Sequence, residues 1–551
     1  MASHGSGALT IEEGGEVSNA TGYLGYGSGS QGMITVTGGG SKWTNAEDLY
    51  VGYEGTGSLA VIDGGAVDVG RTLWASMGDL SGDGTITVGK GAVLDADLVF
   101  DAAHGNQQTL AFGTGGQLHL TIDGTESLGV GYKNAGTLTV AEGAAIDSSI
   151  GYLGYHAGSQ GTATITGRGS RWTVSSGLRV GCGGSGTLTI EDGGEVSSSY
   201  GGILGLGPGS QGTVVITGGG SRWTNASALY VGYDGGSGTL TIEGGGEVSN
   251  TAGYLGRQSG SHGTTTVIGP GSRWTNAGEL WVGYPGRGGI PSGTGSLTVA
   301  DGGQVTADSL SIYYQSTVDL SVSGDDMLVL GTASTTGSVT NNGQINLHAD
   351  AFLPAGTYRP ISEYAGRTMT WSGSGSYSGV GGTWDQTAKT FTVMAPTAQD
   401  AGAAGPVVDG GRLVITDAIS GRRVGVGFGD VPEGATFAAE PLGPAELAGL
   451  TGLLTAGEEV LAVWDFQTTL TGIPVLLSFE VDPQASGLAV WHFADETWSP
   501  CVPDFLVRSQ AGVLSFTVTD FSAYAVTGVP EPATLILLAV GGLAGLGRRR
   551  A

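Results

Sequence analysis

The stretch GTLTIEDGGEVSSSYGGILGL, residues 186–206, decides the fold of this chain. It holds three short runs, TLTI, EVS and ILGL, separated by glycine-rich corners, and their β-branched alternation predicts short strands. Similar segments return every 25 or 26 residues, starting at Gly161, Gly186, Gly212, Gly238 and Gly263. Such self-similarity predicts a solenoid, in which each unit is one coil of a three-sided parallel β-helix.

The composition agrees with an all-β protein and limits its partners. Glycine occupies 108 of 551 positions, roughly three times its ordinary share of about 7%. The net charge of −28 opposes a nucleic-acid backbone, so we expect no nucleic-acid partner. It equally opposes a bare anionic lipid or sugar surface, which divalent cations could bridge. The two cysteines, Cys182 and Cys501, lie in different predicted domains, which excludes a disulfide framework.

Changes in composition and in strand pattern along the sequence predict five segments. Residues 1–315 hold the β-helix repeats, about eleven or twelve coils, and residues 316–394 read as degenerate coils that cap the helix. Residues 395–406, APTAQDAGAAGP, read as a linker. Residues 407–527 contain longer, more apolar strands, typical of an antiparallel β-sandwich. Residues 528–551 form a separate tail, which includes a short hydrophobic helix.

The coils alternate between two types, so the full repeat is 51 residues, as from Trp172 to Trp223 and on to Trp274. Aligning the middle strands places these tryptophans in one column with Val196 and Val248, which suits a filled interior. The preceding position should then face outward. Its side chains alternate in charge: Arg171, Glu195, Arg222, Glu247 and Arg273. Opposite charges in neighbouring coils favour this register over a slip by one coil.

Aromatic residues also recur in the third strand of the coil, as in LYVGY. Leucine and valine alternate there with an outward position that holds Tyr50, Trp74, Tyr230 and Trp281. Two interpretations remain open. An exposed aromatic stripe can stack on sugar rings or on partner proteins, which predicts contact with exopolysaccharide. Alternatively, aromatic residues simply favour strands, since Gly154 and Arg179 interrupt the stripe.

One segment resembles the start of a calcium loop. DLSGDG, from Asp79, offers Asp79, Ser81 and Asp83 as ligands. The closing position holds Lys90, where a bidentate acid should stand, and this favours an ordinary Asp/Gly-rich corner.

Catalytic motifs are missing from the sequence. It contains no Gly-x-Ser-x-Gly, His-Glu-x-x-His or Walker motif, and its seven histidines are scattered. We therefore expect no enzyme activity and no required cofactor. The alternative is a β-helical polysaccharide lyase or hydrolase, which needs clustered carboxylates. Asp95, Asp97 and Asp101 form such a group in an irregular coil, with no evident basic companion.

The tail VPEPATLILLAVGGLAGLGRRRA, residues 529–551, resembles the PEP-CTERM sorting signal of Gram-negative bacteria. The matching residues are Val529, Pro530, Glu531, Pro532, Arg548, Arg549 and Arg550. The resemblance implies processing by an exosortase at the inner membrane. The apolar segment 533–546 would span about 21 Å as a helix against a hydrocarbon core of about 30 Å. That length suits transient membrane association better than an ordinary tail anchor, with the arginines on the cytoplasmic side.

Export also requires an N-terminal signal peptide, and MASHGSGALTIEEGG has no basic and apolar segment of that kind. We therefore expect the true start to lie upstream. The repeats resemble the passenger regions of autotransporter-like surface proteins, and the ending TDFSAYAVT resembles the closing strands of bacterial surface β-sandwich modules. Together these features predict a non-catalytic, secreted or surface-bound structural or adhesive protein of the extracellular matrix.

Overall fold

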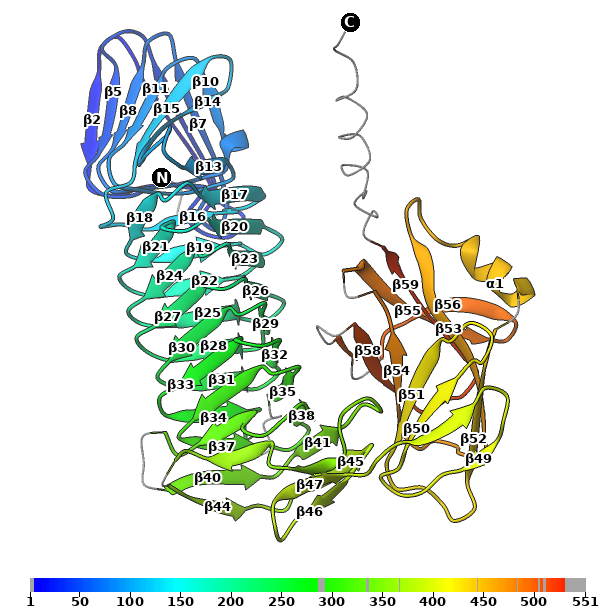
Figure 1. Ribbon diagram of the computed structural model, residues 1–551. Helices are drawn as coiled ribbons and strands as arrows, with labels where there is room; N and C mark the ends of the chain where they lie inside the picture. Colours follow the sequence, from blue (N-terminus) through cyan, green and yellow to red (C-terminus); the bar gives the residue numbers. More distant parts are fainter. Residues whose placement is uncertain are drawn as a thin grey trace, which may run out of the picture. The chain divides into compact units, whose positions relative to one another are not determined.

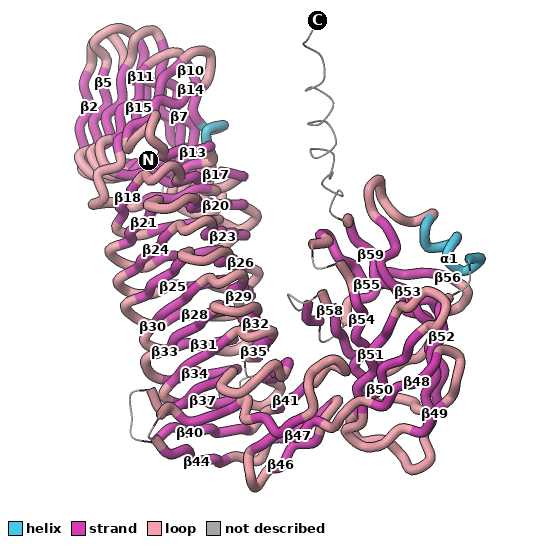
Figure 2. Tube along the Cα trace, viewed as in Figure 1, coloured by secondary structure: helices cyan, strands magenta, loops and turns pink. Residues whose placement is uncertain are grey.

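The computed structural model shows a nearly all-β protein (Figure 2). It describes residues 4–285, 293–332, 336–365, 367–442, 444–482, 484–503, 506–508 and 512–530. One compact unit comprises Asn346 and the described residues before it, together with Arg359–Ser378. A second comprises Leu347–Tyr358 and the described residues from Gly379 on. The predicted C-terminal helix and residues 286–292 lie outside the described residues.

The first unit is a parallel β-helix, as predicted (Figure 1). One representative coil consists of β26 (Gln211–Thr217), β27 (Arg222–Asn225) and β28 (Leu229–Tyr233). Each strand pairs in parallel with its counterpart one coil before and one coil after. Buried and exposed side chains alternate along each strand, so the inward residues of successive coils form continuous columns.

The three faces of the β-helix are not equally continuous. One face is a single 14-stranded sheet, here called the long sheet, which runs from β3 (Gly22–Leu24) to β44 (Thr368–Ser372). The other two faces are each divided into two sheets, with the division near the hairpin β14 (Gln107–Phe112) and β15 (Gly116–Thr121). The sequence of this segment departs from the repeat of 25 or 26 residues, because an antiparallel hairpin replaces a regular coil here.

Tryptophans fill the interior column, as the repeat pattern predicts. Trp223 is completely buried and lies in register between Val196 and Val248. A Cβ on Gly202, at the start of the long-sheet strand of the preceding coil, would lie 2.3 Å from the Trp223 ring. The 51-residue period therefore reflects packing: a coil with valine and glycine alternates with a coil with tryptophan and leucine, and the large ring uses the space beside the glycine.

The outward residues of alternating charge, Arg171, Glu195, Arg222, Glu247 and Arg273, are here called the charge column. They have the predicted register, but not every charged side chain forms a close ion pair with its register neighbour. Glu195 and Glu247 flank Arg222 in adjacent strands. The Arg222 guanidinium approaches Glu247 at 3.1 Å. Lys42, however, pairs with Asp68 of the following coil at 2.5 Å rather than with Glu16, its register neighbour.

The coils continue beyond residue 315 in the segment predicted as a degenerate cap. β38 (Thr317–Ser321) and β40 (Thr336–Asn341) pair in parallel with the preceding coil, and β44 pairs with β40. A small antiparallel sheet of β42 (Gly356–Tyr358), β47 (Thr390–Val393) and β46 (Thr383–Asp385) follows.

The second unit contains the β-sandwich, built from two six-stranded sheets. The first sheet has the order β48 (Thr397–Asp400), β50 (Arg412–Thr416), β51 (Arg423–Phe428), β54 (Val475–Glu480), β58 (Val513–Val518) and β57 (Leu506–Arg508). The second has the order β49 (Gly405–Pro406), β52 (Thr436–Pro441), β53 (Glu459–Thr468), β59 (Ala523–Val529), β55 (Ser486–Ala494) and β56 (Thr497–Cys501). A helix, α1 (Pro444–Thr451), follows β52.

Aromatic side chains form the sandwich core, and one tyrosine fixes a corner of it. Phe428, Phe437, Phe479 and Phe516 are completely buried. The hydroxyl of Tyr524 donates to the backbone oxygen of Asp520 at 3.1 Å, the tyrosine corner typical of such sandwiches.

The structure places strands in the segment predicted as a linker, 395–406. β48 pairs with β50, and β49 pairs with β52. The Ala/Gly/Pro composition of this segment resembles a linker because its strands depend on pairing with the sandwich, which local sequence does not reveal.

Candidate ligand-binding surface

The outer side of the long sheet carries two aromatic ladders. In a typical long-sheet strand the flanking residues, such as Leu229 and Val231, are completely buried, so the residue between them points outward. Adjacent strands bring these outward residues into register. The N-terminal ladder consists of Tyr23, Tyr50 and Trp74, and the C-terminal ladder of Tyr230, Tyr254 and Trp281.

The N-terminal ladder is tightly stacked and partly covered. The Tyr23 and Tyr50 rings lie 4.8 Å apart and are nearly parallel, at 2°, and Trp74 follows at 5.4 Å and 17°. Trp74 is only 5% exposed, because rings of later coils pack over it, including Tyr155 at 5.0 Å. The Tyr132 hydroxyl donates to the Gly52 backbone oxygen at 3.2 Å and holds this cover in place. The prediction that Trp74 belongs to an exposed stripe is therefore wrong.

The C-terminal ladder remains half-buried rather than covered. The Tyr230 and Tyr254 rings stack at 5.2 Å and 13°, and Trp281 meets Tyr254 edge-on at 5.6 Å. The Arg257 guanidinium lies 4.4 Å from the Tyr254 ring centre and donates to the Tyr230 hydroxyl at 3.2 Å. Burial and a 2.5 Å hydrogen bond to Glu279 raise the pKa of Tyr254 to about 12, so this hydroxyl stays protonated at neutral pH.

The four predicted stripe residues do not form one surface. Tyr230 and Trp281 belong to the C-terminal ladder, whereas Tyr50 and Trp74 belong to the N-terminal one. Sequence reasoning missed Tyr254, which links Tyr230 to Trp281. Aligning the segment GYLGR of the intervening coil with LYVGY would have found it.

The predicted calcium ligands do not converge on one point. Asp79 closes a short 3-10 turn and faces the Lys133 ammonium at 3.6 Å, and burial raises the pKa of its carboxyl. Ser81 is exposed, and Asp83 accepts a hydrogen bond of 2.8 Å from the Asp63 backbone. Among the described residues, no group of three or more His, Cys, Asp or Glu side chains is arranged to hold a metal ion.

The three aspartates considered for catalysis are each engaged in local structure. Asp95 accepts a hydrogen bond from the Lys133 backbone at 3.0 Å, and Asp97 accepts one from the Thr137 hydroxyl at 2.6 Å. Asp101 caps a turn, where hydrogen bonds from the His104 ring and backbone lower the pKa of its carboxyl. Sequence reasoning found no basic companion, but the structure brings Lys133 to this region from a later coil.

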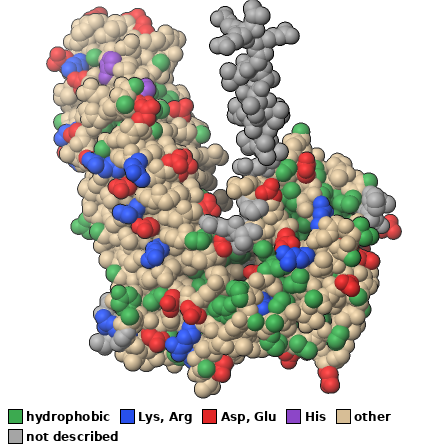
Figure 3. Space-filling model, in the orientation of Figure 1, with side chains coloured by type: hydrophobic (Ala, Val, Ile, Leu, Met, Phe, Trp, Pro, Cys, Tyr) green, Lys and Arg blue, Asp and Glu red, His purple; other side chains and the backbone are tan. Residues whose placement is uncertain are grey.

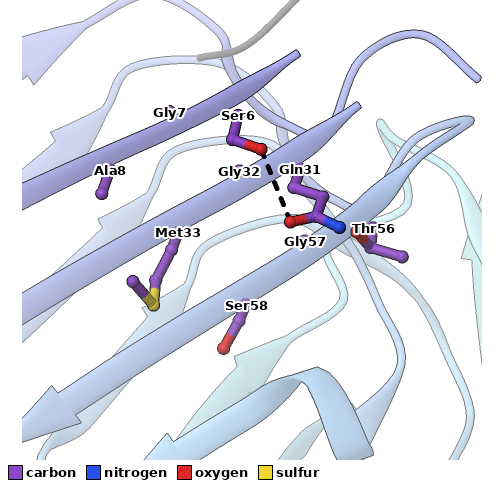
Figure 4. A pocket seen from close by; sticks show the side chains of 9 residues that line it. All are labelled: Ser6, Gly7, Ala8, Gln31, Gly32, Met33, Thr56, Gly57 and Ser58. Carbon is purple, nitrogen blue, oxygen red and sulfur yellow. Dashed lines mark hydrogen bonds between the residues drawn. The ribbon is translucent and has the colours of Figure 1, made fainter. Parts of the chain in front are cut away.

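A hollow of about 420 Å³ lies on the outer side of the first sheet, across β1 (Ser6–Ile11), β4 (Gln31–Thr37) and β7 (Thr56–Ile62) (Figure 4). None of its nine lining residues is charged, and the Ser6 hydroxyl donates to Gln31 at a long 3.5 Å. It therefore offers no charged group for general acid–base chemistry. On the visible face of the β-helix, acidic and basic side chains are interspersed (Figure 3).

The sandwich ends close to the tail, since β59 finishes at Val529. Residues 528–551 match the PEP-CTERM protein-sorting motif. The chain thus carries a PEP-CTERM sorting signal, which marks it as an exosortase substrate exported to the cell surface. Val529 and Pro530 are described, whereas Glu531, Pro532 and the three terminal arginines lie outside the described residues.

Beyond the sorting motif, comparison with other proteins identifies no relative of this chain. Neither the curated proteins nor the solved structures include a significant match. Within the described part of the chain, no helix is both long enough and apolar enough to cross a membrane.

Proposed function

We propose that this PEP-CTERM protein is a non-catalytic structural and adhesive component of the cell surface or extracellular matrix of a Gram-negative bacterium. Its tail associates transiently with the inner membrane until an exosortase acts there. The mature chain then contacts exopolysaccharide through the C-terminal ladder. The observation that carries this proposal is the in-register column of Tyr230, Tyr254 and Trp281 on the outer side of a regular β-helix.

The ladder has the properties of a sugar platform. Sugars present apolar C–H faces and polar edges, and tyrosine and tryptophan offer an apolar ring with a polar tip. The long sheet repeats the outward position at the spacing of neighbouring strands, about 4.8 Å, so a polymer can touch several coils at once. Weak contacts at several coils then add through effective concentration.

The regular stack also favours a structural role over catalysis. Asp95, Asp97 and Asp101, the acids considered for a lyase or hydrolase, accept hydrogen bonds that hold strands and turns. General acid–base catalysis needs a positioned acid and base that can reach a substrate proton. A carboxylate used to secure a turn is poorly placed for that purpose.

A binding assay with matrix polysaccharide from the producing organism tests the proposal. We expect the wild-type protein to be retarded in affinity electrophoresis, and the Tyr230→Ala/Tyr254→Ala/Trp281→Ala variant to lose that retardation while keeping its β-type circular dichroism. The control, Tyr314→Ala/Tyr364→Ala, removes two exposed tyrosines outside the ladder and should bind normally. Equal binding by all three proteins would contradict the ladder's role. Release of reducing ends would indicate the enzyme alternative.

A further inference from the structure

Between the two ladders, the outward column of the long sheet includes an arginine and an isoleucine in place of aromatic residues. After Tyr152 it continues with Arg179 and Ile203 and then reaches Tyr230. A hollow of about 190 Å³, here called the Arg179 hollow, lies at this position. The residues that line it include Ile150, Arg179, Tyr200, Ile203 and Tyr230. Because Tyr230 also begins the C-terminal ladder, the hollow and the ladder form one continuous surface.

Arg179 gives the hollow a positive charge. Three segments supply most of the lining, 150–159, 175–185 and 199–210, and Arg179 is their only Lys, Arg, Asp or Glu residue. A second guanidinium, Arg257, lies 5.2 Å from the centre of the Tyr230 ring at the edge of the hollow. No ion pair joins Arg179 to a carboxylate in the part of the chain that the structure describes. A guanidinium left without an acidic partner is notable in a chain with a net charge of −28. It is complementary to an anionic ligand.

The guanidinium is held in place without being neutralised. It lies 5.2 Å from the centre of the Tyr152 ring, and its Nη1 donates to the Tyr152 hydroxyl at 3.3 Å. Both contacts restrict the long side chain, so less rotamer freedom is lost when a ligand binds. An arginine has five N–H donors in a planar fork, which leaves donors for the two oxygens of a carboxylate.

The remaining walls suit a sugar ring. Tyr200 is 76% exposed and Tyr230 is half-buried, so both can present ring surface to a ligand. The hollow is smaller than the roughly 300–1,000 Å³ typical of pockets for drug-sized ligands, which suits a single sugar residue. An apolar wall with one charged group is also the usual composition of a small-ligand site.

We propose that the Arg179 hollow binds one anionic sugar residue, a hexuronate, of a polysaccharide that continues along the C-terminal ladder. This inference rests on the proposed function. The carboxylate of the uronate pairs with the Arg179 guanidinium, while the sugar ring lies against the tyrosines. The ladder thus supplies contact with any sugar, and Arg179 supplies selectivity for acidic ones.

Oligohexuronates and their carboxyl-reduced, neutral counterparts test the proposal, because the two ligands share backbone length and linkage. We expect Arg179→Gln to weaken binding of the oligohexuronate at least about tenfold and to leave binding of the neutral oligomer unchanged. Arg179→Lys should restore only part of the affinity, since lysine cannot form the bidentate pair. The control Arg222→Gln makes the same change in net charge on another face and should alter neither binding constant.

The outcomes separate this inference from the proposed function. The Tyr254→Ala/Trp281→Ala variant leaves the lining of the hollow intact and should weaken binding of both oligomers. If it does so while Arg179→Gln has no effect, the ladder binds sugar and the uronate site is wrong. An equal loss from Arg222→Gln would also overturn the site, since it would show an effect of total charge. If the wild-type protein binds neither oligomer, both proposals fail for these glycans.

Discussion

Trp274 donates a hydrogen bond of 2.7 Å from its indole Nε1 to the side-chain oxygen of Asn250 in the preceding coil. Trp223 occupies the equivalent place one full repeat earlier, but its buried Nε1 has no partner among the described residues. In the repeat before that, the equivalent Trp172 donates to Ser148 at 3.0 Å, so a serine can serve as the acceptor when its hydroxyl is available. Ser198 stands where Asn250 stands in the later repeat, and its hydroxyl donates to Asn225 at 2.6 Å instead of accepting from the indole.

Replacing Ser198 by Asn should therefore stabilise the β-helix. Asparagine can donate to Asn225 and accept from Trp223, as Asn250 donates to Asn276 at 2.6 Å while accepting from Trp274. We expect the free energy of unfolding to rise by about 1 kcal/mol, because a buried donor gains an acceptor. Urea denaturation measures the change. Ser198→Ala, which removes the hydroxyl, should act in the opposite direction, and a loss of stability in both variants would contradict the argument.

The interior place of Trp223 predicts a large cost for its truncation. The side chain is completely buried, so Trp223→Ala opens a cavity and should lower the free energy of unfolding by about 3–5 kcal/mol. Tyr230→Ala, on the half-buried outer side, should cost much less. Parallel denaturation curves compare the two variants. Ready quenching of Trp223 fluorescence by iodide in the native protein would show that the residue is not interior.

Because Arg222 pairs with Glu247, reversing the charge of Arg222 should lower the stability of the protein slightly, by an amount that depends on salt. Arg222→Glu places three acids next to one another in the charge column, with Glu195 and Glu247. Because the side chains are about half exposed, we expect a loss of roughly 0.2–1 kcal/mol in low salt and less in high salt. The double variant Arg222→Glu/Glu247→Arg should recover part of the loss. An unchanged effect of Arg222→Glu in molar salt would indicate a cause other than charge.

The features that sequence predicts well here are those that repeat. Period-two alternation places Trp223 inside and Arg222 outside, and the constant repeat length aligns both with their neighbours. Because the pattern recurs, a wrong assignment of inward and outward side chains would be repeated in every other coil. The repeats therefore strongly constrain this assignment. For the same reason the outward position of Tyr230 and Trp281 follows from sequence alone.

Features that depend on breaks in the repeat were not predictable in this way. The cover over Trp74 comes from Tyr132 and Tyr155, and the partner of Asp79 is Lys133, more than 50 positions along the chain. These contacts arise where the β14–β15 hairpin interrupts two faces while the long sheet continues. Local periodicity contains no information on which loops then meet.

Because His156 is largely buried, the protein should lose stability in mild acid. Burial, together with the nearby positive charge of Lys133, lowers the pKa of its imidazole to about 4. The unfolded chain, with an ordinary histidine pKa near 6.5, therefore binds more protons than the folded chain between these values. The free energy of unfolding should fall as the pH decreases from about 6.5 toward 4.

Urea denaturation at pH 7 and pH 5 checks this expectation, because most carboxylates remain ionised over that interval. His156→Gln, which cannot titrate, should show a smaller difference between the two pH values than the wild-type protein. The same difference in both proteins would assign the pH dependence to other groups.

The sorting tail predicts a shortened mature chain. Residues 528–551 match the PEP-CTERM motif, and the apolar segment 533–546 would span only about 21 Å as a helix, which is short for a permanent membrane anchor. Mass spectrometry of protein from an exosortase-positive cell should find a C-terminus between Pro530 and Pro532, with Arg548, Arg549 and Arg550 absent. Cells that lack the exosortase provide the control and should retain the full tail. Intact protein ending in the arginines, recovered from the surface of exosortase-positive cells, would show that sorting occurs without cleavage.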